Sequence, residues 1–207
     1  MNNDEPRAVH ACPSADVTID RLFIERAKDI PIAHTISKAT SARQKGALLG
    51  YAQTSLVALR RNGTIYADDA RRQPLFTWHA KLPFMAANQF TVTETSGDVL
   101  AMFGKTLSKT FRSASFNLVT PDGIDATGRD AGSLPGVVKV FSGHQMEVAF
   151  CFQLSGGTNV LRIERGWNAK DPYIVICPPF GKGRHLDWRV AAAMTLVMDV
   201  TLNRSSF

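Results

Sequence analysis

Apolar and polar residues alternate along most of the chain, and short turns that contain glycine interrupt the alternation. In the segment 148–154, one face of the predicted strand carries Val148, Phe150, Phe152 and Leu154. Strict alternation of this kind is typical of a half-buried strand. Turn signals that contain glycine recur at Asn62-Gly63, Gly97, Asp122-Gly123 and Gly156-Gly157. Because Asn, Asp and Gly tolerate positive φ, the pattern predicts a series of antiparallel hairpins.

One segment departs from this pattern. Residues 187–202 read DWRVAAAMTLVMDVTL, and after Arg189 they are apolar on nearly every side. A helix without a polar face is surrounded either by protein or by lipid. A membrane span needs about 20 apolar residues, whereas the uninterrupted run here covers 190–198 and ends at Asp199. We therefore expect a buried core helix with Asp187 as its N-cap, and a polar partner or a place at the end of the enclosure for Asp199.

The hairpins and the helix together predict a mainly β fold. Helical patterns do not alternate with the strands, which argues against a parallel α/β sheet. About ten to twelve antiparallel strands and one apolar helix fit best into a closed barrel with the helix through its middle, because closure removes edge strands and a barrel of this size has an interior to fill. The residues expected to form the structural core of the helix are Val190, Ala192, Met194, Leu196, Val197 and Met198.

The domain organisation follows from the polar start of the chain. Residues 1–20 are polar and show little periodicity, so we expect a disordered leader there and a single barrel domain over 21–207. The start of the chain lacks the apolar segment of a secretory signal, which predicts a cytoplasmic protein. Three cysteines do not suggest a disulfide framework, and we expect Cys151 and Cys177 to be free core thiols.

The charge balance gives the barrel a basic character. The chain has 24 Lys and Arg against 18 Asp and Glu, a net charge of +6. Residues 1–20 carry a net charge of −3, so the remainder carries +9. Such a balance favours anionic partners, although a basic surface also serves solubility alone.

Motifs for catalysis or metal binding do not occur in the sequence. The five histidines are scattered, and neither an HExxH nor a CxxC spacing is present. A GxSxG nucleophile elbow is also missing, and the loop 181–185 that precedes the helix lacks the spacing of a phosphate-binding motif. We therefore expect a protein that is not an enzyme and that has no metal site and no cofactor.

The strongest candidate for a binding site is the segment FGKTLSKTFRSASF. Basic side chains next to hydroxyl groups suit a phosphorylated headgroup, and the candidate headgroup-binding residues are Lys105, Lys109, Arg112 and Ser113. Phe103, Leu107 and Phe111 would enter a bilayer interface if the connection is exposed, or the barrel core if it is not. The alternative reading of the basic residues is a solvated strand face.

Four segments resemble the tubby C-terminal-like superfamily, in particular the LURP-one-related and phospholipid-scramblase-like proteins of bacteria. They are YADDARRQPLFTWHAK (66–81), FTVTETSGDVLAMFGKTLSKTFRSASFNLVTPDG (90–123), GTNVLRIERGWNAKDPYIVI (157–176) and the apolar helix that ends in Asp199. The resemblance covers roughly residues 22–203. It implies a twelve-stranded antiparallel barrel around a central hydrophobic C-terminal helix.

The resemblance also implies a function at membranes, because tubby domains bind phosphoinositides and scramblases associate with membranes. The chain departs from scramblases in two respects. The stretch PPFGKGRHL before the helix is basic and has no carboxylate, and no cysteine cluster for palmitoylation accompanies Cys12. These departures argue against calcium-dependent scrambling.

Two functional classes remain open from the sequence. The first is a non-enzymatic module that binds anionic phospholipid or phosphoinositide headgroups, peripherally at the inner membrane face and without a transmembrane span. The alternative is a protein–protein interaction or regulatory module that has no lipid contact. A nucleic-acid partner is not expected, because the chain lacks interleaved aromatic residues and a groove-reading element.

Overall fold

The computed structural model describes residues 18–27, 33–41, 44–55, 62–81, 89–106, 115–130, 148–165 and 171–202. These ranges contain twelve strands followed by one helix. The first six strands are β1 (Arg21–Arg26), β2 (Ala33–Ser41), β3 (Gln44–Ser55), β4 (Asn62–Tyr66), β5 (Pro74–Lys81) and β6 (Gln89–Glu94). The second six are β7 (Val99–Thr106), β8 (Ser115–Val119), β9 (Asp125–Asp130), β10 (Val148–Leu154), β11 (Asn159–Arg165) and β12 (Tyr173–Ile176), and the helix is α2 (Trp188–Leu202).

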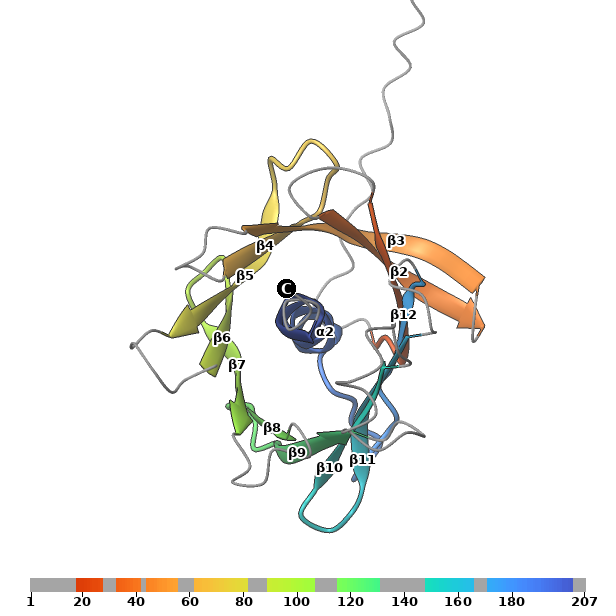
Figure 1. Cartoon of the computed structure of the whole chain (residues 1–207), viewed down its shortest axis with the longest axis vertical. Coiled ribbons are helices and arrows are strands. Elements are labelled where there is room, and N and C mark those ends of the chain that lie inside the picture. Colours follow the sequence, from red (N-terminus) through yellow and green to blue (C-terminus); the bar gives the residue numbers. More distant parts are fainter. Residues whose placement is uncertain are drawn as a thin grey trace, which may run out of the picture.

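The strands form a closed barrel in which each strand is antiparallel to its neighbours in the chain. β12 pairs with β1 to close the ring, and this contact places Leu22 opposite Val175 and Ile24 opposite Tyr173. Figure 1 shows α2 running through the middle of the ring. The predicted antiparallel barrel of about twelve strands around a central C-terminal helix is thereby confirmed.

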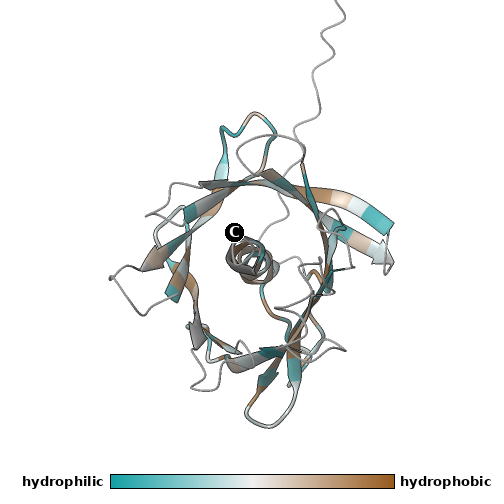
Figure 2. Cartoon of the chain, in the orientation of Figure 1, coloured by the Kyte–Doolittle hydropathy of each residue, from teal (hydrophilic) through white to brown (hydrophobic). Residues whose placement is uncertain are grey.

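The barrel wall follows the alternation of the sequence. In β8, Phe116 and Leu118 are buried whereas Asn117 and Val119 are exposed. Figure 2 shows hydrophobic and hydrophilic residues interspersed along the strands. The inward-facing side chains and the helix share one hydrophobic core, and the burial of such apolar surface is the main favourable contribution to folding.

Helix α2 is enclosed along its described length. Its side chains from Val190 to Asp199 are all at most 1 % exposed, and the six residues expected in its core are within this stretch. The hydroxyl of Thr195 donates to the carbonyl of Ala191 at 2.8 Å, so that this buried polar group is satisfied within the helix. At the start of the helix, Asp187 accepts a hydrogen bond from the backbone N–H of Arg189 at 2.8 Å, which confirms the predicted N-cap.

Three of the four predicted glycine turns are present. Gly97, Gly123 and Gly157 adopt φ values of +95°, +91° and +81°, and each closes a turn between neighbouring strands. The fourth prediction was wrong, because Asn62 and Gly63 belong to β4. Gly63 pairs directly with Trp78, and a Cβ atom at Gly63 would lie only 2.5 Å from the indole ring. This glycine therefore makes room for an aromatic side chain and does not supply a turn.

The predicted leader overlaps slightly with the barrel. Residues 1–17 lie outside the described residues. Ile19 is 2 % exposed and belongs to the core, and the carbonyl of Asp20 accepts a hydrogen bond from the N–H of Cys177 at 2.7 Å. The barrel domain therefore includes residues before the predicted boundary at residue 21.

The two described cysteines are both free thiols, but only one is in the core. Burial, together with the nearby carboxylates of Asp187 and Asp20, raises the pKa of Cys177 to about 12. Cys151 is half-buried on the outer face, where its thiol donates to the side-chain carbonyl of Asn159 at 3.0 Å. The prediction of a core thiol was therefore wrong for Cys151, whose position alternates with the inward-facing Phe150 and Phe152.

Candidate functional site

The antiparallel topology divides the segments between strands into two sets, one at each end of the barrel. At the first end, the odd-numbered strands finish and the even-numbered strands begin; we call it the long-connection end. Its connecting segments are 27–32, 56–61, 82–88, 107–114, 131–147 and 166–172. At the opposite end, which we call the turn end, the segments are 42–43, 67–73, 95–98, 120–124 and 155–158, and 177–187 leads into α2.

The two sets of segments differ in charge. The segments of the long-connection end contain seven basic residues, Lys28, Arg60, Arg61, Lys109, Arg112, Lys139 and Lys170, and three acidic residues, Asp29, Glu147 and Asp171. The segments of the turn end contain five basic residues, Arg43, Arg71, Arg72, Lys182 and Arg184, and five acidic residues, Asp68, Asp69, Asp98, Asp122 and Asp187. The excess of positive charge between strands therefore belongs entirely to one set.

The aromatic residues are distributed in the same way. Phe84, Phe111, Phe141 and Trp167 belong to segments of the long-connection end. The segments of the turn end contain one Phe, Tyr or Trp, namely Phe180, which is 7 % exposed. Basic and aromatic residues therefore occur together in the chain segments that connect the strands at one end.

Of the four residues of the predicted headgroup site, the structure describes the backbone position of one, Lys105. Lys105 belongs to β7, opposite Phe116 of β8, and directly precedes Thr106, the last residue of β7 at the long-connection end. Lys109, Arg112 and Ser113 lie outside the described residues. They belong to the segment 107–114, which connects β7 and β8.

A buried carboxylate, Asp199, marks the same end inside the barrel. Asp199 is in the last turns of α2 and is 1 % exposed. Its Oδ2 atom accepts a hydrogen bond from Arg26 at 2.9 Å. The Nε2 atom of His34 lies 3.3 Å from the same oxygen, close enough for an ion pair but not aligned as a hydrogen bond.

The other carboxylate oxygen is held by a second pair of side chains. The hydroxyl of Tyr173 donates to Asp199 Oδ1 at 2.8 Å, and Arg165 Nη1 lies 3.3 Å from it. Arg165 also donates to the Tyr173 hydroxyl at 2.9 Å, and its guanidinium lies 5.1 Å from the centre of the Tyr173 ring. We refer to Asp199 and these four partners as the Asp199 clamp.

The sheet register explains why these side chains meet. Arg26 is directly opposite His34 in the β1–β2 pair, and Arg165 is directly opposite Tyr173 in the β11–β12 pair. The four strands are neighbours in the order β11, β12, β1, β2. Each cross-strand pair contacts one oxygen of the Asp199 carboxylate. The clamp therefore fixes the last turns of α2 to one continuous part of the barrel wall.

The clamp keeps its central groups in fixed protonation states. Burial would raise the pKa of Asp199, but His34, Arg26 and Tyr173 outweigh this effect and lower its pKa well below the ordinary range. Burial, and then the neighbouring Asp199 carboxylate, raise the pKa of Tyr173 above its usual value. The carboxylate therefore stays charged and the phenol stays a donor, which suits anchoring of the helix and not proton transfer near neutral pH.

Sequence reasoning anticipated a polar partner or an end position for Asp199, and the structure shows both, but the partners were missed. A signal for them exists in the strand alternation. Arg165 continues the inward positions of Leu161 and Ile163, and Tyr173 precedes the inward Val175 by two residues. In the same way, Arg26 follows the inward Ile24 of β1 by two residues, and His34 precedes the inward Ile36 of β2 by two residues. A polar residue in an inward position at a strand end is thus the sequence feature of this clamp.

The described residues offer no group of three His, Cys, Asp or Glu side chains that could hold a metal ion. Within this part of the chain, no helix has the length and apolarity that a membrane crossing would need. The sequence matches no known protein-family model and no curated protein sequence.

Proposed function

We propose that the protein is a non-enzymatic β-barrel module whose long-connection end binds anionic phospholipid headgroups, including phosphoinositides, at a membrane surface. The observation that carries the proposal is the separation of the connecting segments into a basic, aromatic set and a neutral set. Lys and Arg are attracted to anionic leaflets, and Trp and other aromatic residues favour the interface between headgroups and acyl chains. The contact is peripheral and, on this proposal, belongs to the cytoplasmic leaflet.

The barrel core supports a surface contact in preference to a ligand inside the barrel. α2 occupies the middle of the ring, and its residues from Val190 to Asp199 pack against the wall. A lipid would therefore meet the connecting segments at the barrel end. The Asp199 clamp holds the four strands that two of these segments, 27–32 and 166–172, connect, and so gives these two segments a fixed base.

The excess of positive charge in the segments of the long-connection end sets the expected strength of membrane binding. Each basic residue near an anionic membrane contributes about 1 kcal/mol, so a net excess of four charges gives weak and reversible binding. Because exposed charges are screened over roughly 10 Å at 0.1 M salt, the binding should weaken strongly as salt increases.

Co-sedimentation with liposomes tests the proposal. The full chain is mixed with phosphatidylcholine vesicles that contain either phosphatidylserine and a phosphoinositide or no anionic lipid, at low and at high salt. We expect sedimentation only with the anionic vesicles at low salt. Absence of binding to these vesicles at low salt would contradict the proposal.

Two variants locate the contact. Replacing Lys105, Lys109 and Arg112 together by Gln should reduce vesicle binding strongly. The matched control replaces Arg71, Arg72 and Lys182 by Gln, which removes the same number of positive charges from segments of the turn end. If both variants lose binding equally, the effect reflects net charge, and the assignment to the long-connection end is wrong.

A further inference from the structure

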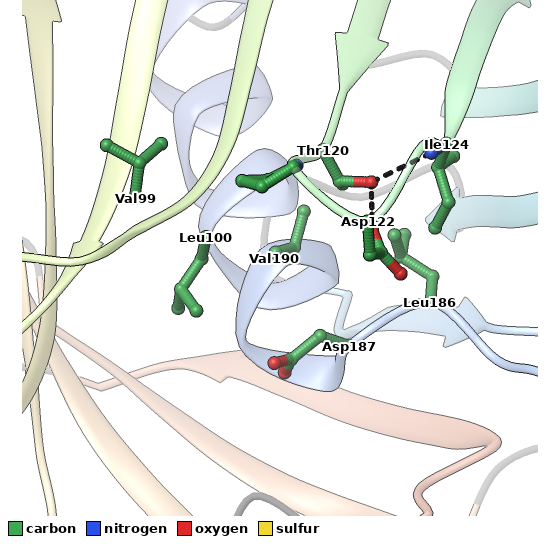
Figure 3. Close-up of a pocket in the computed structure, with 9 residues that line it drawn as sticks. Val99, Leu100, Thr120, Asp122, Ile124, Leu186, Asp187 and Val190 are labelled. Atoms are coloured by element: carbon green, nitrogen blue, oxygen red, sulfur yellow. Dashed lines mark hydrogen bonds between the residues drawn. The ribbon is translucent and has the colours of Figure 1, made fainter.

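A hollow of about 220 Å³ opens at the turn end, beside the first turn of α2. Its apolar lining consists of Val99, Leu100, Pro121, Ile124, Leu186 and Val190. Figure 3 shows the side chains that it labels arranged around the start of the helix; they come from the start of β7, the β8–β9 turn, the segment before α2 and the first turn of α2. The hollow lies at the opposite end of the barrel from the proposed lipid contact.

The size of the hollow limits what it can hold. Pockets for drug-sized ligands have volumes of about 300–1,000 Å³, whereas an apolar cavity of about 150 Å³ is enough for a benzene molecule. At 220 Å³, the hollow has room for one bulky side chain. Single apolar or aromatic anchors of this kind dominate the binding energy of many protein interfaces.

The surface next to the hollow is apolar as well. Val99, which lines it, is 42 % exposed. Met102 and Val119, which are directly opposite each other in the β7–β8 pair, are 54 % and 41 % exposed. These three are the large hydrophobic side chains that the described surface leaves open to solvent. An anchor in the hollow would therefore be followed by an apolar contact along the outer wall.

The charges around the hollow are mainly negative. Both charged residues of the lining, Asp122 and Asp187, are acidic; Arg184 pairs with the first and Arg189 with the second. Asp98 and Asp125, which directly neighbour Val99 and Ile124 in sequence, are exposed and form no ion pair with any described residue. A partner with positive charge beside its anchor is complementary to this rim.

We propose that the hollow is a docking site for a segment of a partner protein that presents one bulky apolar side chain flanked by Lys or Arg. The inference is independent of lipid binding, because it concerns the other end of the barrel and rests on different residues. The anchor fills the hollow between Leu100 and Leu186, and the flanking cations face Asp98 and Asp125. The exposed Met102 and Val119 extend the contact.

Titration with short peptides tests the proposal by two-dimensional NMR of the isotope-labelled full chain. The probes are acetyl-Lys-Trp-Lys-amide and, as its charge-reversed counterpart, acetyl-Glu-Trp-Glu-amide. We expect saturable shifts of the methyl signals of Leu100, Ile124, Leu186 and Val190 with the basic peptide, with a Kd on the order of 1 mM. The acidic peptide should bind detectably more weakly, and D98N/D125N should reduce the difference between the two peptides.

A pair of tryptophan substitutions separates the hollow from the outer wall. Val99→Trp places a large ring at the hollow and should abolish the saturable shifts. His79→Trp adds the same ring to the exposed outer face of β5, outside the proposed contact, and should leave the hollow accessible. The thermal unfolding of both variants is recorded to confirm that each is folded.

Four results would overturn the proposal. The first is the absence of shifts at the hollow with the basic peptide. The second is equal binding by V99W, H79W and the unchanged protein, and the third is equal affinity for the acidic peptide. The fourth is binding of tryptamine to the same signals as tightly as the basic peptide, because the occupant would then be a small cationic ligand and not a protein segment. None of these results depends on vesicle binding, so a negative result for the docking site can be told apart from a negative result for lipid binding.

Discussion

Asp199 is a carboxylate whose surroundings differ sharply from those of an ordinary surface carboxylate. It is buried in the barrel, and two guanidinium groups, an imidazole and a phenol converge on it. Removing one member of a buried ion pair is costly because the remaining charge loses its partner in a medium that solvates it poorly. The phenol of Tyr173 is neutral, so removal of its hydroxyl deletes a hydrogen bond but leaves no charge without an oppositely charged partner.

We expect Asp199→Asn to lower the free energy of unfolding by about 3–5 kcal/mol at neutral pH, and Tyr173→Phe to lower it by about 1–2 kcal/mol. Because the folded-state pKa of Asp199 is depressed, its contribution is present above the ordinary pKa of Asp and is lost as pH falls through the folded-state value. The difference between wild type and Asp199→Asn should therefore shrink below about pH 4. Urea unfolding at several pH values measures it, and a difference that stays constant with pH would contradict this account.

The elements show which parts of the fold the sequence determines locally. Gly97, Gly123 and Gly157 were predictable as turns because each adopts a positive φ that its turn requires. Asn62-Gly63 has the same sequence signal, but the glycine is needed there because a Cβ atom would clash with the indole of Trp78 on the next strand. Such a contact cannot be predicted until the pairing register of the two strands is known. The clamp partners of Asp199 come from β1, β2, β11 and β12, so they could be assembled only after the strands were paired.

For helix α2, enclosure by the wall predicts extreme sensitivity to a buried charge. Ala192 is fully buried in the middle of the helix, and burial of a charged side chain in an apolar core is strongly unfavourable. We expect Ala192→Asp to abolish soluble folded protein, whereas Ala70→Asp, in an exposed turn, should leave expression and melting close to wild type. Circular dichroism and gel filtration of both variants make the comparison, and an Ala192→Asp protein that melts like wild type would refute the enclosed helix.

At the scale of the whole molecule, the barrel depends on a contact between strands that are far apart in the chain. β1 closes the ring by pairing with β12 on one side and β2 on the other. The closed architecture was predictable from the hairpin pattern together with a helix that needs to be surrounded. The charge difference between the two ends was not, because it appears only when alternate connecting segments are assigned to one end.

Two truncations test the role of this closure. Removal of residues 1–17, within the predicted leader, should leave the melting temperature nearly unchanged. Removal of residues 1–27 also deletes β1, opens the ring and uncovers α2, so we expect an aggregated or unfolded product. Similar melting of both truncated proteins would show that β1 is dispensable for the fold.

The enclosure of α2 also has a consequence for the synthesis of the protein. The helix follows all twelve strands in the chain, yet it occupies the space around which they close. During synthesis on the ribosome, the strands emerge first, and their inward apolar faces have no helix to pack against. Folding therefore has to wait until the helix has been released, and in this interval the inward faces of the strands are exposed to other nascent chains and to chaperones.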